Sequence, residues 1–269
     1  MKRIAAINDI SGFGKCSLTA AIPIISALGV QVCPLPTAVL SNQTCFESFY
    51  IKDLTDSMEE IAEKWDELGF KFDGIYSGFL SNERQTDFVM RLTDMYRDAV
   101  YILDPVMGDE GKPYKNFTDG LLKNMLNLTE KADVITPNIT ELCMLTGNSM
   151  KTDIISISKM AKSLMRGRLK TVVVTGIREY DNIQNIVFKS DSYKIFNSKK
   201  IGDGFSGTGD IMSSIIAGFA VKGLDIYRAV DIASKFISHC ISETMKHDFN
   251  PQHGIDFENM LGELIKIDG

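Results

Sequence analysis

The sequence predicts an α/β fold in which helices cover both faces of a mostly parallel β-sheet. Short apolar runs rich in β-branched residues alternate with longer runs of helical periodicity over most of the 269 residues. Glycine ends several of the helical runs, as expected where a helix closes in a left-handed cap. Strands and helices that alternate in this way usually form parallel strands joined by crossover helices.

The first predicted elements are a buried strand at residues 4–7 and a helix at residues 17–28. Residues 30–40 predict an extended segment. Its two prolines, Pro34 and Pro36, favour an open edge or an irregular strand, because proline donates no hydrogen bond to a neighbouring strand. Further strands are expected at residues 73–77, 100–103, 133–136 and 171–175, and further helices at residues 58–68, 83–97, 118–126 and 156–165.

The last third of the chain changes character. Residues 185–188 and 193–196 predict an antiparallel pair of strands, because a short polar turn separates two apolar runs. Two helices are expected next, at residues 208–221 and 226–245. No low-complexity linker, internal repeat or long charge run marks a boundary, so we expect one domain over residues 1–269.

Composition limits the classes of function. The net charge of −6 and the lack of a dense Lys/Arg tract argue against nucleic acid as a partner. Five widely spaced cysteines without a C-x-x-C pair indicate a reducing compartment. Asn8 and Asp9 interrupt the first apolar run before it reaches the length of a signal-peptide core or a membrane span. We therefore expect a cytoplasmic protein with no membrane partner.

Polar residues recur directly after the predicted strands. They occupy residues 8–14, 77–79, 104–109, 136–138 and 175–176. Any one of these groups can be an ordinary helix cap, because Ser, Thr, Asp and Asn favour that position. In open parallel sheets, however, ligands bind beyond the carboxyl ends of the strands. We therefore expect these segments to converge on one cleft.

The segment Gly207-Thr208-Gly209-Asp210 differs in kind from these turns. Its glycines allow close approach of a ligand, and the apolar periodicity that starts at Ile211 places it at a helix N-terminus. Asp210 can be a first-turn carboxylate favoured by the helix dipole. It can also be a base for a hydroxyl group, beside N–H groups that bind phosphate. Together these are two parts of phosphoryl transfer.

Two other glycine patterns are weak. Residues 202–207 match G-x-G-x-x-G, but the match comes late in the chain and Asp225 lies between two helices instead of ending a second strand. Residues 14–15 resemble the end of a P-loop, but Asp9 stands where its first glycine is needed. We expect neither motif to bind a nucleotide in its usual way.

At these residues the chain resembles the ribokinase-like family of vitamin kinases, and within it the pyridoxal and pyridoxamine kinases. The resemblance covers nearly the whole chain and implies a three-layer ribokinase-like α/β fold. It also implies transfer of the γ-phosphate of ATP to the 5′-hydroxymethyl group of a B6 vitamer. The motifs that carry it, in order, are Ser41-Asn42-Gln43-Thr44, Ser77-Gly78-Phe79, Asp104-Pro105-Val106-Met107-Gly108-Asp109, Thr136-Pro137-Asn138-Ile139-Thr140-Glu141 and Gly207-Thr208-Gly209-Asp210.

The resemblance further implies roles for single residues. Asp210 would be the catalytic base, and the amides of Gly207, Thr208 and Gly209 would stabilise charge on the transferring phosphoryl group. The residues expected to bind the vitamer are Asp9, Ser11, Thr44 and Phe79. Those expected to bind the nucleotide are Asp104, Thr136, Asn138, Thr175 and Thr208. Those expected to organise Mg²⁺, in part through water, are Asp104, Asn138 and Glu141.

The family also implies MgATP as the phosphate donor, allows a monovalent cation such as K⁺, and leads us to expect a homodimer. Two alternatives stay open. Residues 9–12 also resemble hydroxymethylpyrimidine kinases of thiamine synthesis, although those enzymes typically carry Cys in place of Asp210 and lack the Ser-Asn-x-Thr pattern of residues 41–44. A nucleotide- or vitamer-binding protein without turnover is the other, and Asp210 and Glu141 argue against it because binding alone needs no base.

Overall fold

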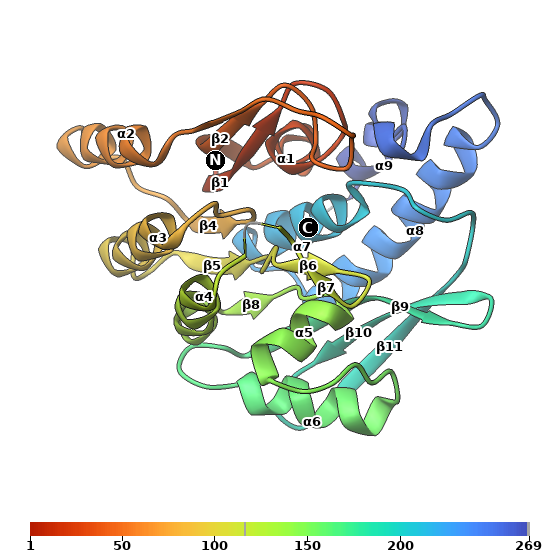
Figure 1. Cartoon of the computed structure of the whole chain (residues 1–269). Coiled ribbons are helices and arrows are strands. Elements are labelled where there is room, and N and C mark those ends of the chain that lie inside the picture. The colour runs from red at the N-terminus through yellow and green to blue at the C-terminus, as the bar shows by residue number, and fades with distance from the viewer. Residues whose placement is uncertain (116, 268–269) are drawn as a thin grey trace.

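One sheet organises the computed structural model, which describes residues 1–115 and 117–267. Within these residues nine strands form the sheet in the order β11-β10-β9-β8-β5-β4-β1-β2-β3 (Figure 1). The five pairs from β2 to β9 are parallel, whereas β3, β10 and β11 join antiparallel. The strands are β1 (Arg3–Ser11), β2 (Gln31–Leu40), β3 (Ile51–Asp53), β4 (Gly74–Ser77), β5 (Val100–Leu103), β8 (Val134–Ile135), β9 (Thr171–Glu179), β10 (Asn182–Phe188) and β11 (Tyr193–Lys199).

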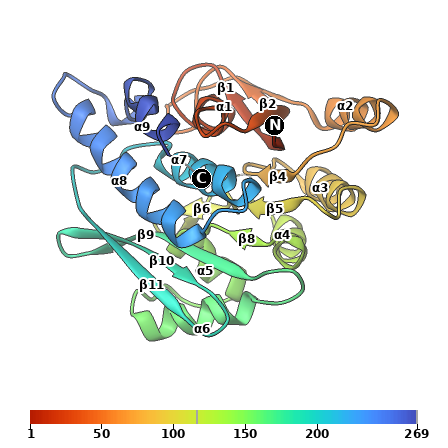
Figure 2. The same ribbon diagram turned by 180° about the vertical axis from the view of Figure 1, so that it is seen from behind.

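Helices cover both faces of this sheet. One face carries α2 (Thr55–Glu67), α3 (Glu83–Met95), α4 (Asp119–Lys131), α5 (Ile139–Thr146) and α6 (Ile154–Leu164). The other carries α1 (Ser17–Ala27), α7 (Thr208–Val221), α8 (Ile226–Thr244) and the short α9 (Leu261–Ile265). In Figure 1 α5 lies in front of the sheet, and in Figure 2, seen from behind, α8 does. The mostly parallel α/β architecture expected from the sequence is confirmed.

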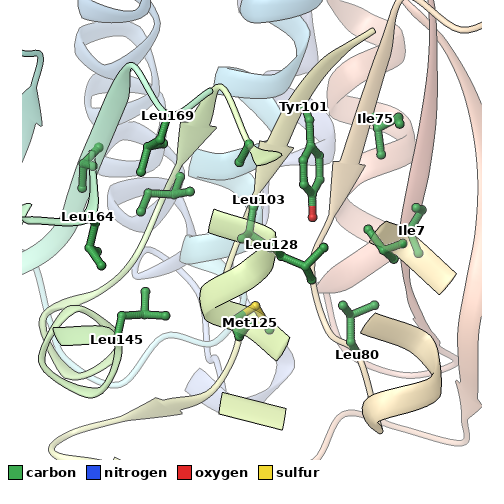
Figure 3. Close-up of a cluster of buried hydrophobic side chains, with 14 of the residues drawn as sticks. Ile7, Ile75, Leu80, Tyr101, Leu103, Met125, Leu128, Leu145, Leu164 and Leu169 are labelled. Carbon is green, nitrogen blue, oxygen red and sulfur yellow. The ribbon is translucent and has the colours of Figure 1, made fainter. Parts of the chain in front are cut away.

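The period-2 geometry of the strands divides the core into two clusters. Ala5 and Ile7 of β1 point into the cluster under α2 to α6, while Ile4 and Ala6 point into the cluster under α1, α7 and α8. In Figure 3 the labelled side chains of the strands face side chains of the helices and loops that cover the sheet on the side of α2 to α6. Because these strands are buried on both sides, they are apolar at nearly every position, which explains why the sequence lacks alternation there.

The strand β2 accommodates its two prolines at an open edge. The edge strand β3 pairs only with Ala38–Leu40 of β2, so the part of β2 that holds Pro34 and Pro36 has no neighbour on that side. This confirms the edge position that the prolines predict.

Several boundaries differ from those expected. Residues 8–11 lie in β1 and not in a loop after it, because the parallel pairing with β2 continues to Ser11 past a register shift near Asp9. The short helix α5, the strand β3 and the two-residue strands β6 (Gly108–Asp109) and β7 (Lys112–Pro113) were not expected. All four elements are too short for a periodic signal.

The helix α7 is held centrally, against β4, β5, α1 and α8. Its N-cap residue Gly207 has φ of 80°, and an added Cβ would lie 2.0 Å from the carbonyl oxygen of Lys15. Only glycine fits that position without moving the backbone of residues 15–16. Gly218 permits a second close approach, because a Cβ there would lie 2.5 Å from the side chain of Leu28, the C-cap residue of α1.

The continuous sheet supports the proposal that residues 1–269 form one domain, of which residues 116 and 268–269 lie outside the described part. None of the helices in the described part combines the length and the apolar character that crossing a membrane requires.

Candidate active site

Carboxyl groups from four separate segments gather at the carboxyl ends of the central strands. Asp9 lies near the end of β1, Asp104 follows β5, and Glu141 and Asp210 lie in the first turns of α5 and α7. The charge of Asp210 acts on Asp104, that of Asp104 acts on Glu141, and that of Asp9 acts on Asp210. The structure therefore brings together the carboxyl groups that the sequence predicted to share a cleft.

Burial raises the pKa of each of these carboxyl groups. The pKa of Asp104 rises to about 7, because burial and the nearby charge of Asp210 disfavour its ionised form. The pKa of Asp210 rises to about 6, chiefly through burial and then through Asp9, which hydrogen bonds only partly offset. Burial and Asp104 raise the pKa of Glu141 well above its ordinary value. Among the described residues, no Lys or Arg is a leading influence on these three groups.

The side chain of Asp210 is held by two donors from distant segments. The amide nitrogen Nδ2 of Asn8 lies 3.4 Å from its Oδ1, and the backbone N–H of Ser17 also donates to the carboxylate. Ser17 opens α1 with φ of 49°, a left-handed conformation that is uncommon for a residue with a side chain. The N-terminal turns of α1 and α7 therefore meet at Asp210.

The residues expected to organise Mg²⁺ are tied to the protein. Oε2 of Glu141 accepts the N–H of Asn138 at 2.8 Å, and Asn138 Oδ1 accepts the N–H of Glu141 at 2.9 Å, so the pair forms a capping box. Oε1 of Glu141 accepts the N–H of Met107 at 3.2 Å. Helix capping therefore accounts for the placement of Asn138 and Glu141, but not for that of Asp104.

No preformed metal site of three or more His, Cys, Asp or Glu side chains occurs in residues 1–115 and 117–267. The bonds of Glu141 leave its oxygens free to accept hydrogen bonds from a hydrated cation, but direct ligation would compete with the capping box. A role through water, as the family resemblance implies, fits this geometry.

Of the residues expected to bind the nucleotide, some are buried and others are partly exposed. The hydroxyl of Thr136 is 2.9 Å from that of Ser213, and Ser213 donates to Oδ2 of Asp104 at 2.8 Å. Thr175 lies beside Asn138, with which it forms a single parallel β-bridge. Thr208 is half-buried at the start of α7, where no side chain caps the helix. Among the residues that the structure describes, no side chain accepts a cap hydrogen bond from the N–H groups of this first turn.

Three of the four residues expected to bind the vitamer lie beside Asp210. Asp9 and Ser11 are buried, and Ser11 Oγ donates to Asp9 Oδ2 at 3.1 Å. Burial raises the pKa of Asp9 despite this bond and a second one from Ser17. The N–H of Phe79 donates to Asn8 Oδ1 at 2.8 Å, which fixes the backbone of Phe79 next to the end of β1.

The fourth, Thr44, is exposed on the loop of residues 41–48. This loop reaches the edge of the site through its backbone: the N–H of Gln43 donates to Phe13 O at 3.0 Å, and that of Gly12 to Leu40 O at 2.8 Å. Within the part of the chain that the structure describes, no hydrogen bond joins Thr44 to the carboxyl groups.

Sequence analysis missed three residues that contact the predicted ones: Asn8, Ser17 and Ser213. Ser213 could have been found, because it follows Asp210 by three positions on one helix and so faces the same side. Ser17 reaches Asp210 through a backbone N–H, which leaves no signal in the sequence, although its side chain also bonds to Asp9. Asn8 precedes the predicted Asp9, and the sequence does not give the direction in which its amide side chain points.

The chain is similar to known kinases over most of its length. The model of the phosphomethylpyrimidine kinase family matches residues 15–256. The chain belongs to this family. A solved structure from Bacteroides thetaiotaomicron, described as a candidate phosphomethylpyrimidine kinase and crystallised with pyridoxal, is 37% identical and has a TM-score of 0.93. That match covers 98% of this chain and 95% of that one.

Relatives within the family carry the name pyridoxal kinase. The enzyme of Dictyostelium discoideum is 24% identical over 251 residues, which is 86% of this chain and 81% of the relative. A pyridoxal kinase of Aliivibrio fischeri is 26% identical over 249 residues, with coverage of 82% and 83%. The solved pyridoxal kinase of Lactobacillus plantarum is 22% identical, covers 98% of this chain and 97% of that one, and has a TM-score of 0.92. These matches confirm the ribokinase-like α/β fold.

The raised pKa of Asp104 predicts how stability depends on pH. The folded protein keeps this proton up to about pH 7, whereas the unfolded chain loses it near the ordinary value of 3.8. The contribution of Asp104 to the free energy of unfolding is therefore present at low pH and lost as the pH rises through about 7. Asp104→Asn should reduce the fall in Tm between pH 5 and pH 8, measured without nucleotide or Mg²⁺.

Asp98→Asn is the matched control, because Asp98 is an exposed carboxylate just before β5, the strand that Asp104 follows. It should leave the difference in Tm between the two pH values as in the unaltered protein. A fall in Tm of equal size in Asp104→Asn and the unaltered protein would contradict the prediction.

Proposed function

We propose that this chain is a pyridoxal kinase, which transfers the γ-phosphate of ATP to the 5′-hydroxymethyl group of a B6 vitamer. The observation that carries the proposal is the first turn of α7, where Asp210 lies beside N–H groups that no side chain caps. The carboxylate supplies a base for the accepting hydroxyl, and the N–H groups of Gly207, Thr208 and Gly209 face the transferring phosphoryl group. Relatives named pyridoxal kinase support the same activity.

The environment of Asp210 suits a general base. A pKa of about 6 keeps the carboxylate ionised at neutral pH and brings its basicity closer to the operating pH than that of an ordinary aspartate. The two donors from Asn8 and Ser17 hold it in one orientation. In this proposal Asp210 takes the proton of the hydroxymethyl group as its oxygen attacks the γ-phosphate.

Mg²⁺ enters as part of the substrate MgATP and neutralises charge on the phosphates. Asp104 would lie towards the cation, and Asn138 and Glu141 would orient its water ligands. The buried carboxyl groups support this placement, because a divalent cation would favour the ionised forms that burial now disfavours. We also propose the monovalent cation, the homodimer and the cytoplasmic location that the family resemblance implies.

Solved neighbours support the choice of substrates. A pyridoxal kinase of Leishmania donovani has been solved with ADP and pyridoxamine, and the Bacteroides thetaiotaomicron protein with pyridoxal. The description of the matching family model favours a second candidate, phosphorylation of a hydroxymethylpyrimidine. Asp210 and the Ser-Asn-x-Thr pattern of residues 41–44 favour the B6 vitamers instead.

A panel of alcohols tests the substrate class. With MgATP in excess, kcat/KM should be higher for pyridoxal, pyridoxine or pyridoxamine than for hydroxymethylpyrimidine, because both distinguishing motifs are those of B6 kinases. The measurement is ADP release coupled to product identification. A higher kcat/KM for hydroxymethylpyrimidine would assign the second candidate, and binding without turnover of any alcohol would identify a non-catalytic protein.

Asp210→Asn tests the base. Asn fits the first turn of a helix and keeps a similar shape, so the fold and the affinity for MgATP should stay near normal. Loss of general-base assistance should lower kcat by about 10²–10⁴-fold. Glu141→Gln supplies the contrast, because it should mainly raise the Mg²⁺ concentration that half-saturates activity. Near-normal kcat in Asp210→Asn would show that Asp210 only stabilises the first turn of the helix and is not the base.

Gly209→Ala tests whether phosphate approaches the first turn of α7. No protein atom lies within 4 Å of the added Cβ, and alanine favours helices, so Tm should be unchanged or higher. If the phosphoryl group packs against this turn, the methyl group should lower kcat/KM for MgATP. Thr118→Ala, at the cap of the distant helix α4, is a control that should lower Tm without this kinetic effect. Unchanged kinetics in Gly209→Ala would contradict the placement of the phosphate.

A further inference from the structure

We propose that Asn8 is a positioning residue that aims the Asp210 carboxylate at the substrate hydroxyl and couples it to the backbone of Phe79. This inference rests on the proposed kinase activity and deepens it. Asn8 is fully buried in the second half of β1, and its side chain contacts its neighbour Asp9 and two distant segments, at Phe79 and Asp210.

The hydrogen bonds of Asn8 fix the orientation of its amide. Its Oδ1 accepts the N–H of Phe79 at 2.8 Å and that of Asp9 at 3.0 Å. A nitrogen of the amide has no lone pair to accept these bonds, so the amide cannot be flipped. Nδ2 must therefore face Asp210, whose Oδ1 lies 3.4 Å away. That distance is long for a hydrogen bond, as is common at catalytic groups before substrates bind.

A second observation shows how closely the amide is enclosed. An added Cβ at Gly78 would lie 2.3 Å from Nδ2 of Asn8 and 2.9 Å from Oδ1. Because Gly78 has no side chain, the amide of Asn8 can occupy this space. The turn of residues 77–79 and the amide fit one another, so a shift of this turn would also move the donor that faces Asp210.

The regular alternation of β1 accounts for this placement. The register with β2 stays regular up to Asn8, which is opposite Pro36, and shifts only beyond it, where Ile10 is opposite Val39. Here Asn8, on the same face of β1 as Ala6, is directed at α7, while its backbone still pairs with β2.

Several other titratable groups surround the Asp210 carboxylate, and a variant at Asn8 acts in their presence. Those whose charge or pKa is linked to Asp210 are Asp9 of β1, Cys16 before α1, Tyr76 of β4, Asp104 after β5 and Tyr114 after β7. A substitution at Asn8 leaves all of these residues in place, but a charge introduced there would act on the adjacent Asp9 as well as on Asp210.

Asn8→Asp isolates the contact with Asp210. The new carboxylate can still accept the N–H groups of Phe79 and Asp9, but it replaces the donor that faces Asp210 with a second acceptor. We expect kcat to fall by about tenfold or more, while KM for the vitamer changes little. Two facing carboxyl groups share a proton, so the acidic limb of the kcat/KM profile should move to higher pH by about one unit or more.

Two further variants separate positioning from structural support. Asn8→Leu removes all three hydrogen bonds and should lower Tm and raise KM for the vitamer, because the N–H of Phe79 loses its acceptor. Asn124→Asp is the matched control: Asn124 of α4 donates to the Asp87 carboxylate at 2.9 Å on the opposite face of the sheet. It creates the same pair of facing carboxyl groups and should leave kcat and the pH profile unchanged.

The result that overturns the inference is an Asn8→Asp variant with kcat within about twofold of the unaltered protein and an unshifted pH profile. A pH profile that moves equally in Asn124→Asp also overturns it. If the unaltered protein phosphorylates a vitamer and Asp210→Asn does not, these two results reject only the role of Asn8. The proposed kinase activity then stands. If the unaltered protein phosphorylates no alcohol, the proposed function itself fails.

Discussion

Burial of several carboxyl groups at one end of the sheet, without a basic side chain to balance them in the described part, is the constraint on which this site depends. Asp104, Glu141 and Asp210 each have a raised pKa because they are buried and because they lie near one another. Such a group of like charges opposes folding unless protons or cations neutralise it. In the proposed function, the cation that accompanies ATP would relieve this electrostatic cost.

The two apolar clusters of the core stabilise the fold against the electrostatic cost of burying these carboxyl groups. Strands buried on both faces carry apolar side chains in both directions, and the helix α7 lies between the sheet and the outer helices. Close contacts fix the helix in place, because Gly207 and Gly218 leave room for Lys15 and Leu28. Asp210, the proposed base at the start of this helix, is held by the core and by two donors at its carboxylate, Asn8 and Ser17.

Capping and catalysis are not exclusive explanations for the polar residues of this site. Asn138 and Glu141 form a reciprocal cap, as their spacing allows, and they also lie at the edge of the carboxyl cluster. The cap orders the side chain of Glu141, so that its remaining capacity as an acceptor points in a defined direction. Helix ends are suited to such double use, because their unpaired N–H groups need acceptors and favour anions.

The sequence by itself determined the class of fold, the element boundaries of β5 and α7, and the segments that supply the site. Apolar periodicity and the glycines of residues 207–210 carry that information locally. Only the tertiary structure decided which way Asn8 points, that the N–H of Ser17 reaches Asp210, and that Thr44 lies exposed on its loop. Those outcomes depend on the register of β1 with β2 and on the packing of α7 against α1. Both are contacts between residues distant in the chain, which no local pattern encodes.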